Sequence, residues 1–161
     1  MTAEITPHHF TLTDDAVGNY DTNAKMNPPL RSADDRTCIL NALSDQTIDV
    51  IATDHAPHTI LEKELEFDYA ANGIIGLETS LGLSLKLVNE GVLNMETLIE
   101  KLSKNPSRIL GLENGISVGK TADFTIIDPK RTCVYRVQNG CSKSKNTPFD
   151  GWEFPGKAIY T

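Results

Sequence analysis

The apolar run Val50–Ala52 and the polar residues after it constrain the fold more than any other stretch of the sequence. A short run of this kind is typical of a strand that is buried on both faces, as in a parallel sheet. Asp54, His55 and His58 follow, and Pro57 cannot continue a hydrogen-bonded ladder, so the chain must leave the sheet here. A buried parallel strand that ends in a carboxylate and two imidazoles predicts one wall of an active site in an α/β barrel. The alternative is a strand followed by a polar loop in which Asp54 caps the next helix.

Helices are predicted on both sides of this strand in the sequence. Ser32 has the side chain of an N-cap, and Asp34 and Asp35 would lie in the first turn, where the helix dipole favours negative charge. The resulting helix, about a dozen residues long, leads through a short turn into the strand at 49–53. After the strand, the apolar pattern from 79 to 90 predicts a largely buried helix, and Asn94 caps another. Asn105–Ser107 is predicted to interrupt that second helix, with Pro106 in the first turn of a short helix that Gly111 ends. This alternation is that of a parallel α/β sheet.

Two adjacent histidines stand near the N-terminus, in a segment predicted to be the end of a strand and its exit loop. Neighbouring side chains on a strand point to opposite faces. His8 and His9 could therefore reach one metal ion only if the backbone bends between them, and they make a weak metal pair. We expect both rings to pack and to support neighbouring residues by hydrogen bonds.

The segment Met26–Arg31 contains two consecutive prolines, which forbid a helix and hold Asn27 in the extended region. A rigid extended segment that presents the Asn27 amide and the Arg31 guanidinium suits a ligand with a carboxylate or an amide. The alternative is an ordinary proline-rich turn with a solvated arginine. Further along, Gly73 and Gly76 would let the backbone approach a ligand closely and offer it their N–H groups.

From residue 115 the apolar pattern changes to the period of a strand. Strands are predicted at 116–120, 122–129 and 132–137. Residues 139–161 have the composition of a loop, anchored by Phe149, Trp152 and Phe154, and an apparent strand begins at Lys157. The expected organisation is an α/β body at 1–112 followed by a β-rich part at 113–161.

Composition argues against several classes of function. The net charge is −7, from 15 basic and 22 acidic residues, which argues against a nucleic acid or an anionic membrane as partner. No apolar run approaches the roughly 18 residues of a membrane span, and the start of the chain does not read as a signal peptide. Cys38, Cys133 and Cys141 have no C-x-x-C spacing and are expected to be reduced thiols. The expected location is the cytoplasm.

Several stretches together resemble one family of enzymes. They follow one another along nearly the whole chain: Ile5–His9, Met26–Arg31, Ala52–His58, Gly73–Thr79, Asn105–Leu112 and Gly119–Asp128. They are similar to the C-terminal part of dihydroorotase of the longer bacterial type, within the metal-dependent amidohydrolase superfamily. The pair Asp-His-Ala-Pro-His and Asn-Pro-Pro-Leu-Arg is specific to it, whereas Gly-Lys-x-Ala-Asp is shared by many amidohydrolases.

The resemblance implies a (β/α)₈ barrel of the TIM type, with a small β-sandwich built from both ends of the intact chain. Residues 1–112 would form the C-terminal portion of the barrel, about its last three strands and their helices. Residues 113–161 would form part of the sandwich and the C-terminal tail. The family's site holds zinc, commonly two ions. It opens the cyclic amide of dihydroorotate reversibly to N-carbamoyl-aspartate, in pyrimidine synthesis.

The same resemblance implies roles for particular residues. Asp54 matches a carboxylate at the end of the eighth barrel strand that binds the metal and also carries the proton. Zinc lowers the pKa of bound water, and a carboxylate within reach can pass the proton to the leaving nitrogen. Asn27 and His58 match positions that hold the substrate's carboxylate and ring, and Asn72 and Gly73 match a substrate-contacting pair. The usual residue at position 72 is Phe, so a backbone role is expected there.

The chain also departs from the family, because the other metal ligands would lie upstream of residue 1. His8 and His9 do not match ligand positions. One carboxylate cannot hold a catalytic zinc, which takes about three protein ligands. The chain is therefore expected to be a piece of a dihydroorotase, inactive alone, whose exposed strand edges favour aggregation or a partner. Such a partner would be a second copy or a carbamoyltransferase.

Two alternatives remain open. A hydantoinase or an allantoinase also opens a cyclic amide, and Asn27, Arg31 and His58 favour a ring that carries a carboxylate only through the resemblance. The second alternative is a non-catalytic barrel relative that serves as an assembly partner of a carbamoyltransferase. The presence of Asp54 and His58 speaks against that role, because a scaffold needs neither.

Overall fold

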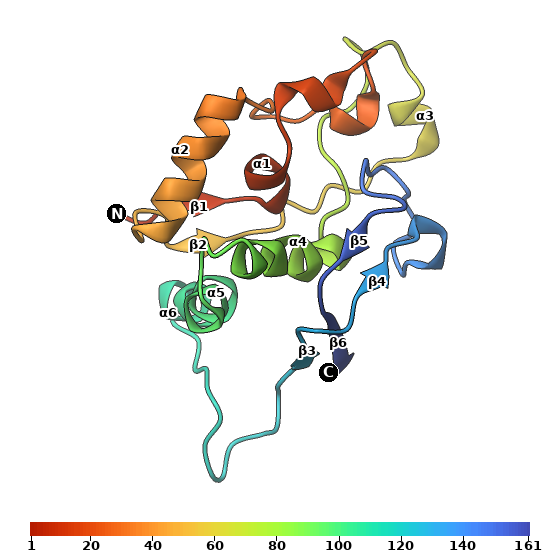
Figure 1. The fold of residues 1–161 in the computed structure, drawn as a ribbon. Coiled ribbons are helices and arrows are strands. Elements are labelled where there is room, and N and C mark those ends of the chain that lie inside the picture. The colour runs from red at the N-terminus through yellow and green to blue at the C-terminus, as the bar shows by residue number, and fades with distance from the viewer.

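The computed structural model describes residues 1–161, which form a mixed α/β fold of short strands and helices (Figure 1). The α-helices are α1 (Pro7–Thr11), α2 (Ala33–Ser44), α3 (Ile60–Lys63), α4 (Leu77–Asn89), α5 (Met95–Ile99) and α6 (Asn105–Leu110). Tighter or wider helical turns are η1 (Asp14–Val17), η2 (Thr22–Ala24), η3 (Glu100–Lys104) and η4 (Val137–Asn139). The strands are β1 (Glu4–Ile5), β2 (Val50–Ile51), β3 (Ile126–Asp128), β4 (Cys133–Val134), β5 (Glu153–Phe154) and β6 (Lys157–Tyr160). None of the helices combines the length and apolar character needed to cross a membrane.

Strand β2 is the centre of the parallel part of the fold. It pairs in parallel with β1, with Glu4 opposite Val50 and Ile5 opposite Ile51. Both residues of β2 are buried, as a strand covered on two faces requires. Just beyond it, His55 forms an isolated parallel bridge with Ile74. The predicted strand at 49–53 is thus confirmed in position and direction, although its regular part is shorter.

Side-chain caps set the starts of two helices where the sequence predicts them. The Ser32 hydroxyl accepts from the Asp35 N–H at 3.2 Å, and the Asp35 carboxylate accepts from the Ser32 N–H at 3.3 Å, which together form a capping box before α2. The Asn94 side chain accepts from the Thr97 N–H at 2.8 Å before α5. Both predicted N-caps are confirmed.

The segment after β1 is a helix, and the predicted exit loop is wrong there. Pro7 lies in the first turn of α1, where a missing N–H removes no helical hydrogen bond. His8 and Phe10 on this helix are buried. The two histidines therefore belong to a helical turn, and the rule that strand neighbours face opposite ways does not apply to them.

The break predicted at Asn105–Ser107 does not occur, because α5 continues through a π-helical turn, η3, into α6. Pro106 lacks an N–H, and its ring would clash with the carbonyl of Leu102 in a regular α-helix. The wider turn before it accommodates the proline without ending the helix. Gly111 then ends α6 in the left-handed conformation, with φ of 68°, as predicted.

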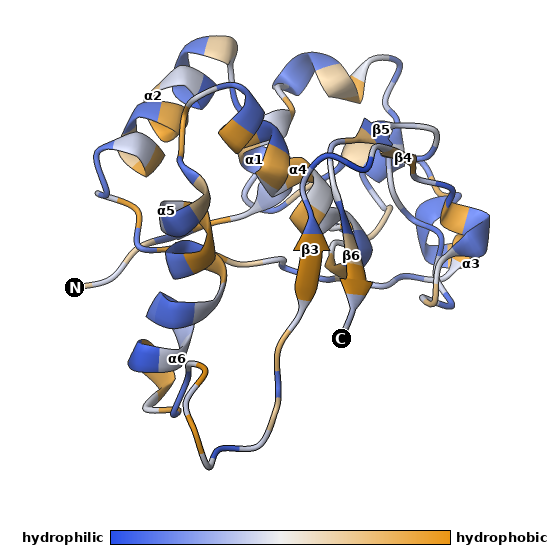
Figure 2. Cartoon of the chain, turned by 60° about the horizontal axis from the view of Figure 1, so that its bottom comes forward, coloured by the Kyte–Doolittle hydropathy of each residue, from blue (hydrophilic) through white to orange (hydrophobic).

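The C-terminal part contains fewer strand residues than predicted. Residues 116–120 form no strand, and the other two predicted strands shrink to β3 and β4. β3 pairs antiparallel with β6, and β4 pairs antiparallel with β5, as separate two-stranded sheets. A strand needs a neighbouring strand to which it can bond, and no strand pairs with residues 111–125. The apolar residues of β3 and β6 stand out in Figure 2.

One hydrophobic core joins the two ends of the chain. Helix α4 lies at the middle of the molecule, with α1 and α2 on one side of it and the tail strands on another (Figure 1). The core residues with the least exposure include Phe10, Leu43, Ile74, Leu83, Leu98 and Phe149. The tail anchors Phe149 and Phe154 belong to this core, as predicted, and Trp152 packs against it. Residues 111–125 are exposed throughout and form a long loop away from the core.

Candidate active site

Asp54 lies where the chain leaves the parallel strands, in a strained backbone conformation. Its φ is +45°, in the left-handed region that non-glycine residues seldom adopt. The side chain is exposed, and its carboxylate takes part in none of the hydrogen bonds or ion pairs of the structure. Strain of this kind clusters at functional sites. The Asp54 carboxylate, just after strand β2, is therefore exposed and makes none of the hydrogen bonds or ion pairs of the structure.

His55, the next residue, fixes this exit to the start of α4. Its Nδ1 accepts from the Gly76 N–H at 3.0 Å and from the Leu77 N–H at 3.4 Å, so Nε2 carries the ring hydrogen of the neutral form. A Cβ on Gly76 would lie 2.6 Å from the Thr53 carbonyl oxygen, a distance that only glycine allows. The sequence predicts that the Gly76 N–H is available to a ligand. The structure shows instead that it is hydrogen-bonded to His55.

His58 is held from two directions. Its main-chain N–H donates to Asn146 Oδ1 at 3.2 Å, and its Nε2 donates to the Asn72 carbonyl at 2.9 Å. The other ring nitrogen, Nδ1, lies 3.9 Å from Glu62 Oε2. The imidazole thus lies against the main chain of Asn72, another residue that the resemblance assigns to the substrate site.

Gly73 is fixed at both ends of its peptide unit. Its N–H donates to the Lys25 carbonyl at 2.8 Å, and its carbonyl accepts from Asn146 Nδ2 and from Lys63 Nζ, each at 3.2 Å. Its φ is +99°, and a Cβ there would lie 2.7 Å from the Ala56 Cβ. Glycine is required for both reasons. Its N–H is not free for a ligand, which corrects the expectation from the sequence.

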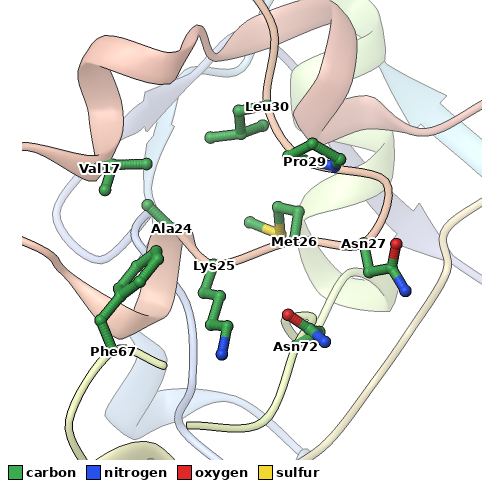
Figure 3. Close-up of a pocket in the computed structure, with 9 residues that line it drawn as sticks. All are labelled: Val17, Ala24, Lys25, Met26, Asn27, Pro29, Leu30, Phe67 and Asn72. Carbon is green, nitrogen blue, oxygen red and sulfur yellow. The ribbon is translucent and has the colours of Figure 1, made fainter. Parts of the chain in front are cut away.

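Asn27 and Asn72 come together at the wall of a cavity of about 350 Å³ (Figure 3). Lys25 and Asn72 lie toward one end of it, and Val17 and Leu30 toward the other. The remaining lining residues are Ala24, Met26, Pro29 and Phe67. Of the predicted site residues, Asp54, His58 and Gly73 are not part of this wall. His58 and Gly73 connect to it through Asn72 and Lys25.

His9 supports the Asn27 segment from behind. Its Nε2 donates to the Pro28 carbonyl at 2.9 Å, and the Thr6 hydroxyl lies 2.6 Å from its Nδ1. One neutral tautomer satisfies both bonds, because the carbonyl can only accept and the hydroxyl can donate. His8 is buried, and burial, with a smaller contribution from His9, lowers the pKa of His8 to about 3. The expectation that the rings pack and support neighbours by hydrogen bonds is confirmed for His9, whereas the His8 ring is packed in the interior and makes none of the hydrogen bonds of the structure.

Two lysines shape the loop that carries Asn72. Lys25 Nζ donates to the carbonyls of Asp68 at 3.0 Å and Ala70 at 2.7 Å. Lys63, which is buried, donates to the Ala71 carbonyl at 2.8 Å as well as to Gly73. Burial, and then the neighbouring charge of Lys25, lower the pKa of Lys63. No sequence pattern marked these lysines or Asn146, because lone polar residues that reach distant carbonyls leave no periodicity.

These residues do not by themselves fit a metal ion. No group of three or more His, Cys, Asp or Glu side chains in the structure could hold one. Asp54 is the only predicted ligand, and a catalytic zinc takes about three protein ligands. The arrangement therefore offers one exposed carboxylate, and that carboxylate does not line the cavity to which Asn27 and Asn72 belong.

Comparison with known proteins gives concordant matches in sequence and in structure. The family model described as "Amidohydrolase family" matches residues 3–161. A dihydroorotase of Geobacter metallireducens is 59% identical over 162 residues, and one of Desulforapulum autotrophicum is 60% identical over 161. Each alignment covers 100% of this chain and 38% of the relative. The chain thus spans less than half the length of these curated relatives.

Solved structures match over the same extent. L-Hydantoinase (dihydropyrimidinase) from Arthrobacter aurescens superposes with a TM-score of 0.91 at 30% sequence identity, covering 98% of this chain and 37% of that one. D-Hydantoinase (dihydropyrimidinase) from Thermus sp. gives a TM-score of 0.85 at 26% identity, covering 98% and 36%. The arrangement of strands, helices and tail described above is therefore one that these longer hydantoinases contain.

Proposed function

Because the chain belongs to the amidohydrolase family, we propose that it forms part of a dihydroorotase, which hydrolyses dihydroorotate reversibly to N-carbamoyl-aspartate. The observation that carries the proposal is the identity of 59–60% to curated dihydroorotases along the whole chain. The solved hydantoinases match at 30% or less. Sequence similarity at this level favours dihydroorotase over the other cyclic-amide hydrolases.

In this proposal residues 1–112 are the C-terminal portion of a (β/α)₈ barrel. The parallel pair of β1 and β2 and the bridge between His55 and Ile74 support it, because they place three successive segments side by side in parallel. The polar residues follow these segments, at the edge where barrel enzymes carry their sites. Residues 113–161 would contribute β3 to β6 to a small β-sandwich that other strands complete.

Asp54 is the proposed metal ligand and proton carrier. Its exposure and its unengaged carboxylate support this role, since a carboxylate can accept a proton from water and release it to a leaving nitrogen. We propose zinc as the metal of the intact enzyme, with the remaining ligands supplied from outside residues 1–161. Asp54 alone cannot hold the ion.

Asn27, His58, Asn72 and Gly73 are the proposed substrate-binding residues. Their support is spatial: Asn27 and Asn72 share one cavity wall, and His58 and Gly73 are hydrogen-bonded to the segments that form it. An amide side chain such as that of Asn27 can donate to a substrate carboxylate and accept from a ring N–H. The proposed ligand is therefore a small cyclic compound that carries a carboxylate.

The proposal extends to location and assembly. A net charge of −7 disfavours nucleic acids and anionic membranes as partners. We place the protein in the cytoplasm, and its assembly partner would be a second copy or a carbamoyltransferase.

The test is reconstitution. The purified chain is assayed with zinc, alone and mixed with a separately produced upstream portion of the Geobacter metallireducens dihydroorotase. We expect turnover of dihydroorotate only in the mixture, and a loss of at least about a hundredfold with Asp54→Ala, because a general acid–base group contributes on that order. Asp34→Ala, which removes an exposed carboxylate on α2, is the matched control and should keep activity. Failure of every mixture to turn over dihydroorotate contradicts the proposal.

A hydantoinase is the second candidate, because the chain superposes on L-hydantoinase with a TM-score of 0.91. The same mixtures are given hydantoin and allantoin in place of dihydroorotate. Faster turnover of either compound than of dihydroorotate would transfer the assignment to that enzyme class.

A further inference from the structure

We propose that Asn146 is a positioning residue that holds the His58 loop and the Asn72–Ile75 segment in their relative places. The inference rests on the proposed function, because it gives this tail residue a task in the substrate site of that enzyme. Asn146 lies outside every stretch that carries the family resemblance and outside the cavity wall.

The side chain of Asn146 bonds both segments at once. It is 5% exposed. Its Oδ1 accepts from the His58 N–H at 3.2 Å, and its Nδ2 donates to the Ala56 carbonyl at 2.9 Å and to the Gly73 carbonyl at 3.2 Å. Only the amide nitrogen can donate to two carbonyls, and only the oxygen can accept from an N–H, so the orientation of the amide is fixed.

The main chain of Asn146 adds a fourth bond, because its carbonyl accepts from the Ile75 N–H at 3.0 Å. The two segments touch directly at two places: the Ala56 N–H donates to the Ile74 carbonyl at 2.8 Å, and the His58 ring donates to the Asn72 carbonyl at 2.9 Å. The groups that the Asn146 side chain bonds, at Ala56, His58 and Gly73, lie at or between these two links, and the Ile75 N–H lies just beyond them. Asn146 therefore acts as a clasp that adds four hydrogen bonds to the two by which these segments bond each other directly.

The clasp meets the site at His58 and Gly73, two of the four proposed substrate-binding residues. Loops carry most binding residues and are more mobile than the elements they join. Small misplacements of binding groups lower the affinity for a ligand steeply. Removal of the clasp should therefore loosen the substrate contacts while leaving Asp54 on its own strand exit.

The first test measures amide hydrogen exchange, residue by residue, in the 161-residue chain. Asn146→Ala should speed exchange at the His58 amide by about tenfold or more, because that amide loses its only acceptor. Amides in the parallel strands, such as Ala52, should be unchanged. Asn105→Ala is the matched control, because it removes a partly buried amide that donates to the Asp49 carbonyl at 2.9 Å, away from both loops. Uniformly faster exchange along the chain, or no change at His58, overturns the proposal.

Asn146→Asp gives a signature that a merely structural role would not produce. The ionised carboxylate keeps an acceptor for the His58 N–H but faces the carbonyls of Ala56 and Gly73 without a hydrogen to donate. Protonation restores one donor. The protection factor at Gly73, corrected for intrinsic exchange, should rise as the pH falls in this variant and stay flat in the wild type. A variant that is flat as well contradicts the clasp.

The second test uses the reconstituted mixture with dihydroorotate. Asn146→Ala should raise KM about tenfold with kcat changed less than about threefold, because the lost interaction acts on binding. Asn105→Ala should leave both constants unchanged. A fall in kcat with unchanged KM overturns the proposal. If the wild-type mixture is inactive, the proposed function fails, and hydrogen exchange alone decides the clasp.

Discussion

His8 and His9 are neighbours in the sequence and have opposite environments. His9 is partly exposed and bonded through both ring nitrogens, whereas His8 is 2% exposed. At the scale of single residues, the structure depends on such buried polar groups: Lys63, Asn146 and His8 all lie inside the protein. Each must be neutral or fully bonded there, because an unbonded polar group in the interior costs free energy.

Acid should destabilise the protein through His8. Burial lowers the folded-state pKa of His8 to about 3, whereas the unfolded chain titrates near 6.5. Between these values the unfolded state binds the additional proton, so the free energy of unfolding falls as the pH drops from 6.5 toward 3. The slope approaches about 1.4 kcal/mol per pH unit. His8→Gln, measured by urea unfolding at pH 7, 6, 5 and 4, should show a shallower slope. An identical slope in the variant would contradict this origin.

Helix α4 shows how one element connects the body of the fold to the tail. Seven of its residues are buried, among them Gly82, Leu83 and Leu85. A Cβ on Gly82 would lie 2.5 Å from the Phe154 ring, so the absence of a side chain lets β5 approach the helix. Leu85 meets Gly156 from the same face. The close packing of the tail against α4 therefore restricts which side chains α4 can carry at positions 82 and 85.

Gly82→Ala tests this close approach. In an exposed helix the change would stabilise by about 1 kcal/mol, but overpacking costs roughly 1–3 kcal/mol. Because the contact is with a ring packed in the core, we expect net destabilisation, measured as a lower urea midpoint. Ser84→Ala in the same helix is the comparison. The Ser84 hydroxyl is buried without a partner, so its removal should stabilise by roughly 1 kcal/mol. If the Gly82→Ala protein were more stable, the Phe154 ring would have to move aside to make room for the methyl group, which would contradict the expected overpacking.

The extent of prediction from sequence differs between elements for a physical reason. Ser32, Asn94 and Gly111 act within one helical turn, and their effects were predictable from neighbouring residues. The prediction of a strand at 116–120 was wrong, because a strand forms only beside a pairing partner, and the local sequence does not specify that partner. The role of Asn146 could not be predicted either, since its side-chain partners lie 73 to 90 residues away in the sequence.

At the scale of the whole molecule, one core holds residues from both ends of the chain, and a single exposed loop joins them. The core contains Phe10 from α1 and Phe149 from the tail. Residues 111–125 between α6 and β3 are exposed throughout. Packing therefore connects the tail to the body more strongly than the loop does. The motifs predicted the site residues as separate stretches, and their connection through the tail became visible only in three dimensions.

Limited proteolysis tests this arrangement. Trypsin should cut first after Lys120, in the exposed loop, because cleavage requires an extended, accessible segment. The two products should then elute together on size exclusion, held by the Phe154 contact with α4 and by the bonds of Asn146. The Asn146→Ala protein, cut in the same way, should separate at lower urea than the wild type. Immediate separation of the wild-type products would contradict a shared core.

The clasp of Asn146 also bears on protein engineering. Residues 53–76 contain most of the proposed site residues, and they would be the obvious segment to transplant onto another scaffold. The side-chain amide of Asn146, near the C-terminus, is needed to hold these residues in place. A transplant without residues 145–147 would lose that support, so the smallest transferable unit is discontinuous, and a circularly permuted chain would be the simplest way to carry both pieces together.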